Sequence, residues 1–428
     1  MNETVYISVV IPVWNPGPGI EKCIESLREQ TLKSIEIIFV DDLGTDDSVA
    51  RIQAAMEQDK RIRLIRNKEN LGPGASRNAG IEAAQGEYVS FIDPDDYVAK
   101  DFYQRLYSRA KADNLDIVKG RILYQREDGS IAPHHEQNDT IRKGLSAGKP
   151  PYAIFTYEHH SAIYRREMLM RSGARYGFAR RAQDTTFLLR ACHAAKSLGL
   201  EDEALYYFCE RQDSAMHVFS LKSLEQRRFS FEEQVDYLVS ALSEDRYAPD
   251  YTIGLFMTSL RFYSCYEGSP DAEPALRDYC EGMRQQLLRL PFLDTMKKRC
   301  FPVRALVDYH TPLPAVPGFL PWETSPSLEQ VAVLNRWADF VLAHPECAGD
   351  AAPEMGRIFY RIKKTCEEEM KLEKTAPAAE KALQSAQETM NRLPPSFHQQ
   401  TAKEGAKKKI AKKMPAWIKK LARFFLKR

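Results

Sequence analysis

The sequence predicts an α/β domain in the amino-terminal half of the chain, followed by a mostly helical region. In the first 130 residues, short apolar runs alternate with amphipathic helical patterns. After residue 220, apolar residues recur at helical spacing and β-rich runs are few. With 428 residues, 43% of them hydrophobic and 28% charged, the chain has the composition of a globular protein of two or three domains. No apolar run approaches the roughly 18 residues of a membrane span, so we do not expect an integral membrane protein.

Four apolar runs are predicted to form strands of one parallel sheet. They occupy residues 7–11, 35–40, 62–65 and 88–92. Nearly continuous apolar runs of this length are typical of strands that are buried on both faces. Helical patterns over residues 20–31 and 74–84 alternate with these strands, and Asp46 or Asp47 could cap a further helix. Pro12 is expected to end the first strand. The repeated order of strand, helix and strand indicates a βαβ domain.

Several carboxylates follow directly after the predicted strands. These residues are Asp41, Asp42, Asp93, Asp95 and Asp96. In such sheets the ligand site lies beyond the carboxyl ends of the strands. Like charges placed together are unfavourable unless a cation lies among them, so the cluster predicts a metal site. The alternative is that the DPDD segment caps a helix or faces solvent, which the motif alone does not exclude.

Three motifs in order connect these observations to a known family. They are VVIPVWN (residues 9–15), FVDDLGTDDS (39–48) and NLGPGASRNAGIEAAQGEYVSFIDPDD (70–96). Together they resemble the family 2 glycosyltransferases of the GT-A fold, which assemble bacterial surface polysaccharides. The resemblance covers residues 5–217, about half the chain, and does not extend to the helical second half. It implies a Rossmann-like mixed sheet flanked by helices.

The resemblance also implies the partners of the reaction. A sugar would move from a nucleotide-sugar donor, most commonly a UDP-sugar, to a hydroxyl of a glycan or lipid-linked acceptor, with Mn²⁺ or Mg²⁺ as cofactor. Pro12, Val13 and Trp14 would lie along the nucleotide, and Asp42 would accept a hydrogen bond from the base. The family more often has tyrosine in place of Trp14. Leu43 stands where the family commonly has glycine, and this difference affects the turn after Asp42.

The metal and the diphosphate are assigned in the same way. Asp95 would face the ribose and the metal, and Asp96 would bind the metal–diphosphate. Arg77 would lie near the diphosphate or hold its loop. In the segment YYFCERQDSAMH, Arg211 and Ser214 would approach the diphosphate. His217 would complete the metal shell, and an ordinary surface histidine is the alternative.

The segment AQDTTFLLRA supplies a candidate catalytic base. It resembles the EDxxFxxR pattern of the family. Gln183 replaces the glutamate of this pattern, and Asp184 matches its aspartate. An inverting transfer needs one carboxylate to take the proton of the acceptor hydroxyl, and no covalent intermediate. We therefore expect Asp184 to be the base; the alternative is a helix N-cap. His159 and His160 border the acceptor pocket in this family, but their presence is equally explained by local packing, and no chemistry is assigned to them.

The end of the chain is strongly basic. Residues 402–428 hold 11 Lys and Arg against one Glu, whereas the rest of the chain holds 50 basic and 58 acidic residues. Apolar residues recur at helical spacing among the lysines: Ile410, Met414, Trp417, Leu421 and Phe424. Pro415 would start a separate helix over residues 416–428. This pattern predicts an amphipathic tail that lies on an anionic membrane surface. A solvated charge run and a helix docked on the acidic body are the alternatives; nucleic-acid binding is not expected, because no recognition fold accompanies the charge.

Four parts are expected along the chain. They are a glycosyltransferase domain (1–220), a helical domain (221–373), a linker (374–401) and the basic tail (402–428). The helical domain could select the acceptor, form homo-oligomers or dock a partner. Eight scattered cysteines without a CxxC pair, and an amino terminus unlike a signal peptide, predict a cytoplasmic protein with reduced thiols. The basic tail predicts that this protein is peripheral at the inner face of the cell membrane.

Two other functions fit parts of the pattern. A sugar nucleotidyltransferase also combines an α/β sheet with a metal, but it would need a Gly-rich loop with a basic residue after the first strand, where this chain has IPVWNPGPG. A non-catalytic scaffold of a polysaccharide assembly complex could keep the fold without the activity. The intact DPDD segment and Asp184 argue against a scaffold.

Overall fold

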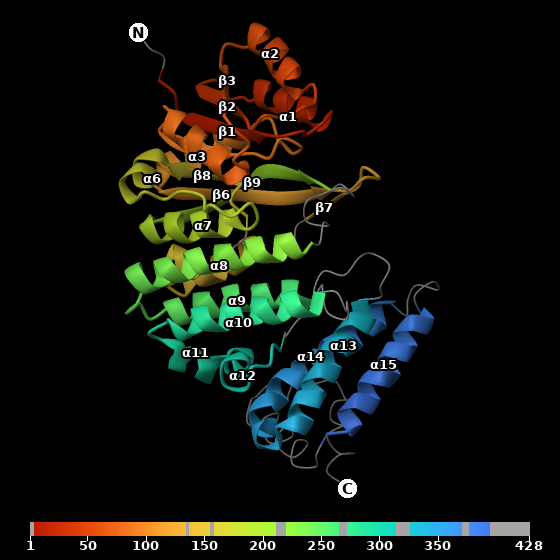
Figure 1. Cartoon of the computed structure of the whole chain (residues 1–428). Helices are drawn as coiled ribbons and strands as arrows, with labels where there is room; N and C mark the ends of the chain where they lie inside the picture. Colours follow the sequence, from red (N-terminus) through yellow and green to blue (C-terminus); the bar gives the residue numbers. More distant parts are fainter. Residues whose placement is uncertain are drawn as a thin grey trace. The chain divides into compact units, whose positions relative to one another are not determined.

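The computed structural model describes residues 4–133, 137–154, 158–210, 220–264, 272–313, 326–369 and 376–393. The chain divides into two compact units, Met1–Tyr251 and Thr252–Arg428 (Figure 1). Among the helices described, none combines the length and apolar character needed to cross a membrane. Arg211, His217 and the whole basic tail lie outside the described residues.

The first unit is built on one nine-stranded mixed sheet. Its strands are β1 (Ile7–Val13), β2 (Ile35–Asp41), β3 (Ile62–Arg66), β4 (Tyr88–Phe91), β5 (Tyr97–Val98), β6 (Ile117–Gln125), β7 (Ile131–Pro133), β8 (Ala162–Arg165) and β9 (Leu198–Cys209). Their order is β3-β2-β1-β4-β8-β6-β9-β5, with β7 paired to β6. Strands β1 to β4 are parallel, β8 is antiparallel to both β4 and β6, and β9 is parallel to β6. Strand β9 therefore ends at the same edge of the sheet as β1 and β4.

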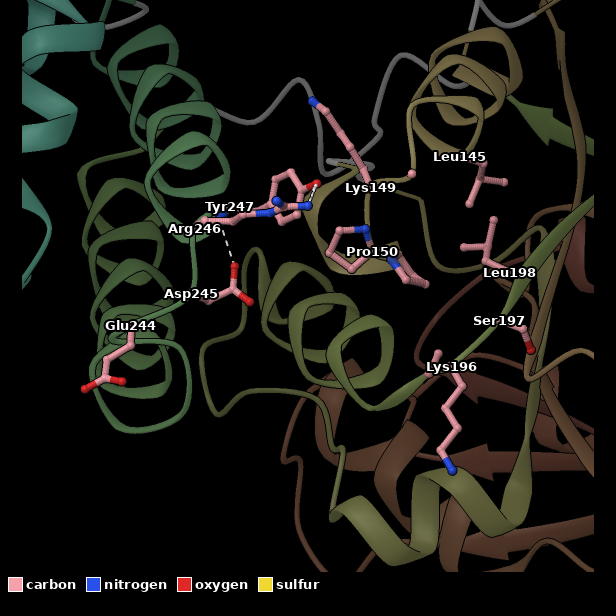
Figure 2. A pocket seen from close by; sticks show the side chains of 13 residues that line it. Leu145, Lys149, Pro150, Lys196, Ser197, Leu198, Glu244, Asp245, Arg246 and Tyr247 are labelled. Atoms are coloured by element: carbon pink, nitrogen blue, oxygen red, sulfur yellow. Dashed lines mark hydrogen bonds between the residues drawn. The ribbon is translucent and has the colours of Figure 1, made fainter.

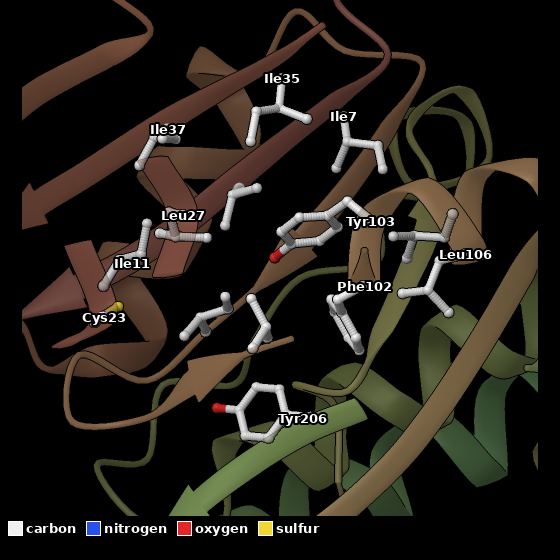
Figure 3. Packing of buried hydrophobic residues seen from close by; sticks show 14 of the residues in the cluster. Ile7, Ile11, Cys23, Leu27, Ile35, Ile37, Phe102, Tyr103, Leu106 and Tyr206 are labelled. Carbon is white, nitrogen blue, oxygen red and sulfur yellow. The ribbon is translucent and has the colours of Figure 1, made fainter. Parts of the chain in front are cut away.

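The helices of this unit flank the sheet or follow it. They are α1 (Gly19–Arg28), α2 (Ser48–Gln58), α3 (Pro73–Ala83), α4 (Phe102–Ala112), α5 (Gln137–Ser146), the 3₁₀ turn η1 (Pro151–Ala153), α6 (Arg166–Ser172), α7 (Gln183–Ala194), α8 (Leu221–Ala241) and the start of α9 (Ala248–Ser264), which continues into the second unit. Side chains of α1, α4 and the sheet, among them Leu27, Phe102 and Ile11, form one apolar core (Figure 3). The predicted α/β architecture is confirmed.

Pro12 does not end the first strand, so that prediction was wrong. Strand β1 continues to Val13 and keeps its register with β2, where Pro12 pairs with Val40. The pairing with β4 reaches only Val10. Beyond that point β1 has a neighbour on one side only, and the missing N–H of proline is tolerated there.

Helix α3 approaches the sheet closely because residue 80 is a glycine. A Cβ atom at Gly80 would lie 2.2 Å from Cγ1 of Val10, a distance that real side chains do not adopt. The glycine of the ASRNAG motif therefore sets the distance between α3 and β1. This contact places Arg77 and Asn78, one turn earlier, beside the carboxyl end of the sheet.

The boundary of the first unit lies later than the expected 220/221. Helix α8 packs on α7, where Ser230 Oγ donates to the carbonyl oxygen of Ala182 at 2.7 Å and Gln234 Nε2 donates to Thr185 Oγ1 at 3.0 Å. These partly buried hydrogen bonds join α8 to the first unit. The two units meet at Tyr251 and Thr252 in the chain, within α9.

The second unit is helical, as expected. Its helices beyond α9 are α10 (Glu273–Leu288), α11 (Leu293–Arg299), α12 (Phe301–Tyr309), α13 (Pro326–Ala343), the 3₁₀ turn η3 (Pro345–Cys347), α14 (Ala348–Glu369) and α15 (Ala376–Asn391). The expected linker over 374–401 contains α15, which packs on α13 and α14 through Ala379, Ala382, Ala386 and Met390. The small side chains of this Ala-rich segment permit close helix packing while adding little to its apparent hydrophobicity, so the segment resembles a linker in the sequence.

Candidate active site

The loops after β1 and β2 are tied together at the edge of the sheet. The side-chain oxygen of Asn15 accepts hydrogen bonds from the backbone N–H groups of Thr45 at 2.6 Å and Asp46 at 3.2 Å. Asp46 Oδ2 in turn accepts the N–H of Gly17 at 2.9 Å. Pro12 and Val13 are buried in β1, whereas the Trp14 side chain is 60% exposed. Of the three residues assigned to the nucleotide, Trp14 presents a large accessible surface.

Asp46 also supports the start of α2. Its Oδ1 accepts the N–H of Ser48 at 3.2 Å, whereas Asp47 occupies the N-cap position without a capping hydrogen bond from its side chain. Of the two capping candidates, Asp46 is therefore the one that binds the first turn.

Asp42 fixes the loop that leads into α3. Its buried carboxylate accepts hydrogen bonds from Asn67 Nδ2 at 2.7 Å and from the N–H groups of Leu71 at 3.0 Å and Gly72 at 2.8 Å. The next residue, Leu43, adopts a φ of 62°, the left-handed conformation that glycine adopts without strain. Leu43 therefore holds, at this position, a backbone conformation that is open to glycine at no cost. Contact of Asp42 with a nucleobase stays a prediction.

Asp41 has a similar supporting role. It is fully buried, and its Oδ2 lies 2.8 Å from Nε of Arg66. Its Oδ1 accepts the N–H of Gly44 at 3.1 Å. The carboxylate therefore stabilises the turn between β2 and α2.

Arg77 and Asp93 form a partly buried ion pair beside the site. Arg77 Nη2 lies 2.6 Å from Asp93 Oδ1, and the guanidinium stands 5.3 Å from the centre of the Tyr176 ring. Burial would raise the pKa of Asp93, but Arg77, with His159 and His160, holds it at about 2. The Nε and Nη1 groups of Arg77 are buried and have no hydrogen-bond partner among the described residues. Such donors favour an anionic ligand, because an unmet buried donor is costly.

Asp96 is buried at the same edge, against the end of β9. Its oxygens accept hydrogen bonds from Tyr206 Oη at 2.6 Å and from the N–H of Cys209 at 2.8 Å. Burial, and then the negative charges of Asp95 and Asp93, raise the pKa of Asp96 well above its usual value. Asp95 is half-buried in the intervening turn. The charged form of Asp96 is therefore disfavoured by its own surroundings, and a bound cation would reverse this effect.

A divalent cation at this edge would need ligands from a substrate as well as from the protein. Within the described ranges, no three His, Cys, Asp or Glu side chains lie together as a complete metal site. Mg²⁺ is commonly held by one or two carboxylates and the phosphates of a substrate, so a pair such as Asp95 and Asp96 is sufficient on the protein side. The other residues assigned to the metal and the diphosphate, His217 and Arg211, fall outside the described part of the chain.

Asp184 lies in the first turn of α7 and is not its N-cap. Ala182 occupies the N-cap position, and Asp184 is the second residue of the helix. The Asp184 side chain is 28% exposed, and its Oδ2 lies 3.8 Å from Nδ1 of the buried His159. The capping interpretation is therefore wrong, and the carboxylate is accessible.

One pair of hydrogen bonds brings the base segment to the donor segment. Asn78 Nδ2 donates to the carbonyl oxygen of Tyr176 at 3.1 Å, and the N–H of Tyr176 donates to Asn78 Oδ1 at 2.9 Å. This pair joins α3 to the loop that precedes α7. The Tyr176 ring lies 5.3 Å from the Arg77 guanidinium and 5.4 Å from the His159 ring, and His159 lies 3.8 Å from Asp184. Burial lowers the pKa of Arg77, and the charges of Asp93, Tyr176 and, to a smaller extent, Asp184 raise it. Asp184, Arg77 and Asp93 thus belong to one site.

Comparison with known proteins agrees with this geometry. The model of the family described as Glycosyl transferase family 2 matches residues 8–173. The glycosyltransferase EpsJ of Bacillus subtilis is 36% identical over 219 residues, which are 50% of this chain and 63% of EpsJ. The glycosyltransferase YibD of Escherichia coli is 30% identical over 242 residues, which are 53% of this chain and 69% of YibD. The chain belongs to the family 2 glycosyltransferases.

The fold of this family 2 chain is also found in a solved structure. The crystal structure of S. aureus TarS 1-349 in complex with UDP-GlcNAc superposes with a TM-score of 0.54 and 18% identity, over 72% of this chain and 91% of that one. This similarity confirms the GT-A fold that the motifs predict. The match to EpsJ spans less than two thirds of its length. The matched family region ends at residue 173, before Asp184.

Three residues that contact the candidate site residues were missed or left without a role in the sequence. Tyr206 binds Asp96, Tyr176 lies under Arg77, and His159 lies beside Asp184. The signal for His159 is a pair of adjacent histidines directly before a buried strand. For the two tyrosines no pattern in the sequence distinguishes them from ordinary core aromatics.

A separate cavity lies at the opposite edge of the sheet. It has a volume of about 800 Å³ and is lined by three turns, at residues 148–151, 195–198 and 244–247 (Figure 2). Leu198, in its wall, is the first residue of β9, whereas Asp96 contacts the last, Cys209. The cavity is therefore distinct from the carboxylate site.

Proposed function

We propose that this chain is an inverting, metal-dependent glycosyltransferase. It would transfer a sugar from a nucleotide-sugar, in our view a UDP-sugar, to a hydroxyl of a glycan or lipid-linked acceptor in surface polysaccharide synthesis. One observation carries the proposal: an accessible carboxylate, Asp184, lies near the partly buried pair of Arg77 and Asp93, the first residue of the DPDD segment. This arrangement supports a proton acceptor and a diphosphate-binding edge that act in a single site.

The residues divide the chemistry between a donor side and an acceptor side. On the donor side, the exposed ring of Trp14 offers a surface for the nucleotide, and Arg77 offers two unmet N–H donors for the diphosphate. A divalent cation, Mn²⁺ or Mg²⁺, held by Asp95 and Asp96 would supply positive charge opposite the leaving diphosphate. On the acceptor side, Asp184 takes the proton of the hydroxyl whose oxygen attacks the anomeric carbon. The bond from the anomeric carbon to the diphosphate oxygen breaks, and the configuration at the anomeric carbon is inverted.

The choice of UDP rests on resemblance. UDP is the commonest nucleotide of the family, and TarS, whose fold this chain shares, was solved with UDP-GlcNAc. The choice of a surface polysaccharide rests on the group of family 2 enzymes that the three motifs resemble. A non-catalytic scaffold is less well supported, because Asp184 is partly exposed and its charge acts on Arg77, the partner of Asp93 in the DPDD segment.

A donor screen tests the proposal. The full chain is incubated with Mn²⁺ and, in turn, UDP-, GDP-, CDP- and dTDP-sugars. Release of nucleoside diphosphate measures turnover, and a thermal-shift assay measures binding of the donor. We expect a UDP-sugar to raise the melting temperature and to be turned over at least about tenfold faster than the others, with loss of turnover in EDTA. Release of pyrophosphate from a nucleoside triphosphate and a sugar phosphate would instead identify a nucleotidyltransferase. Binding of a donor without any turnover would favour the scaffold.

We further propose that residues 402–428 hold the protein on an anionic membrane surface. Each basic residue near such a surface contributes on the order of 1 kcal/mol, and this segment has 11 of them. Truncation after Gln400 should therefore lower binding to vesicles that contain phosphatidylglycerol by at least about tenfold, as measured by co-sedimentation. Vesicles of phosphatidylcholine alone are the control and should bind both forms weakly. Equal sedimentation of the two forms with anionic vesicles would refute this anchor.

A further inference from the structure

His159 is a buried histidine whose ring has unmet hydrogen-bonding groups. Its side chain is in the segment before β8 and the residue is 4% exposed. Neither ring nitrogen has a hydrogen-bond partner among the residues that the structure describes. Leaving such a group unpaired in the interior costs about 1–3 kcal/mol. The unpaired ring of His159 therefore lowers the stability of the fold.

The position of the ring is fixed by aromatic neighbours. Its centre lies 5.4 Å from that of Tyr176, 6.1 Å from that of Phe91 and 5.3 Å from that of His160. The backbone is held as well, because Tyr164 Oη donates to the carbonyl oxygen of His159 at 2.9 Å. The ring therefore cannot turn away from Asp184 without disturbing this packing.

The unmet Nδ1 faces the proposed base. It lies 3.8 Å from Oδ2 of Asp184, which is about 1 Å longer than a hydrogen bond. Asp184 is partly exposed in the first turn of α7, so a small rotation of its side chain can close this gap. Hydrogen bonds in active sites commonly tighten in this way when substrate binds.

The ring is neutral at neutral pH. Burial, followed by the charge of Arg77, lowers the pKa of His159, and the opposing effects of Asp184 and Asp93 are smaller. The adjacent His160 is also buried, with a pKa well below its usual value. A neutral imidazole carries one N–H, which can donate a hydrogen bond to a carboxylate, and it carries no positive charge.

We propose that His159 is a positioning residue for the catalytic base. Its Nδ1–H donates to one oxygen of Asp184, which fixes the carboxylate and directs the second oxygen to the acceptor hydroxyl. The same hydrogen bond stabilises the charged carboxylate, which is the form that takes the proton. This inference rests on the proposed role of Asp184.

Two substitutions of His159 separate this role from packing. His159→Leu removes the donor and keeps an apolar side chain, whereas His159→Asn places an amide N–H near the position of Nδ1 and does not titrate. In the full chain, with the donor found by the screen, we expect His159→Leu to lower kcat roughly 10- to 100-fold, the range for a hydrogen bond to a charged group. The KM for the donor should not change, and the acidic limb of the kcat–pH profile should move to higher pH. His159→Asn should recover most of kcat and the wild-type pH profile.

The matched control is a histidine on the same helix as the base. His193, in the last turn of α7, is bonded through Nδ1 to Tyr237 Oη at 2.7 Å and does not contact Asp184. His193→Leu should leave kcat and the pH profile unchanged. If His159→Leu retains both, or if His159→Asn loses as much kcat as His159→Leu, the positioning role is overturned.

The variant Asp184→Asn separates failure of this inference from failure of the proposed function. Full activity of Asp184→Asn would overturn the base assignment and this inference with it. If Asp184→Asn is inactive while His159→Leu is fully active, only the positioning role fails. Where Asp184→Asn retains measurable activity, adding His159→Leu should cause no further loss, because two residues that act as one unit are not additive.

Discussion

Asp184→Asn is expected to lower the rate of sugar transfer by about 100- to 10,000-fold without weakening donor binding. The asparagine amide has the shape of the carboxylate but cannot take a proton, and a general base contributes a factor of this size. The substitution should not disturb the fold, because Asp184 is partly exposed and Ala182, not Asp184, occupies the N-cap position of α7. Single-turnover release of nucleoside diphosphate measures the first effect, and titration of the donor by calorimetry measures the second.

A second aspartate in a first helical turn provides the control for this experiment. Asp139 lies in the first turn of α5 and pairs with Arg142 on the surface. Asp139→Asn should transfer sugar at the wild-type rate. Full turnover by Asp184→Asn would show that another group takes the proton. Equal losses in the two variants would indicate a general effect of charge.

Asp96→Asn is expected to abolish the activity that depends on a divalent cation, with a loss of at least about 100-fold. Asparagine can still accept the N–H of Cys209 and can donate to the hydroxyl of Tyr206, so both ties to β9 are retained. The negative charge, which burial and Asp95 disfavour, is lost. Without ligands the variant should therefore be at least as stable as the wild type. Turnover as a function of Mn²⁺ concentration, and melting temperature with and without Mn²⁺ and nucleotide, measure both effects.

Tyr206→Phe distinguishes the charge of Asp96 from its structural contact. It removes one hydrogen bond to Asp96 and leaves the carboxylate in place. We expect this variant to keep its dependence on Mn²⁺ and to lose no more than about tenfold in rate. A loss as large as that of Asp96→Asn would mean that the contact with β9, rather than the charge, is essential. Cation-dependent turnover by Asp96→Asn at the wild-type rate would contradict the metal role.

The strand-end aspartates illustrate how far a motif can be interpreted. By position alone, Asp41, Asp42, Asp93 and Asp96 are alike, since each lies at or just after the end of a buried strand, and only the resemblance to the family gave Asp42 and Asp96 separate roles. In the structure the first two bind loop backbone and Arg66, Asp93 pairs with Arg77, and Asp96 meets β9. Each carboxylate differs because its partner comes from a different segment, which the position at a strand end does not reveal.

Strands β1 to β4 could be predicted to within about two residues, whereas no strand was predicted for β5 to β9. Strands buried on both faces must be apolar along their length, so β1 to β4 stand out against the helical patterns between them. Helix α15 could not be distinguished from a linker, because its buried face consists largely of alanine. Likewise the late boundary at Tyr251 depends on Ser230 and Gln234 of α8, polar residues whose partners are on α7.

The sequence by itself determined the family, the α/β order of the first unit and the edge of the sheet at which a ligand would lie. These features follow from local patterns, namely apolar runs, the residues that end them and motifs of fixed spacing. Only the tertiary structure placed Asp184 beside the Arg77–Asp93 pair and His159 beside Asp184. These contacts join α3, α7 and the segment before β8, and they depend on how the chain folds back between Asn78 and Tyr176. Such an arrangement is set by packing between segments remote in the sequence, and a local pattern does not encode it.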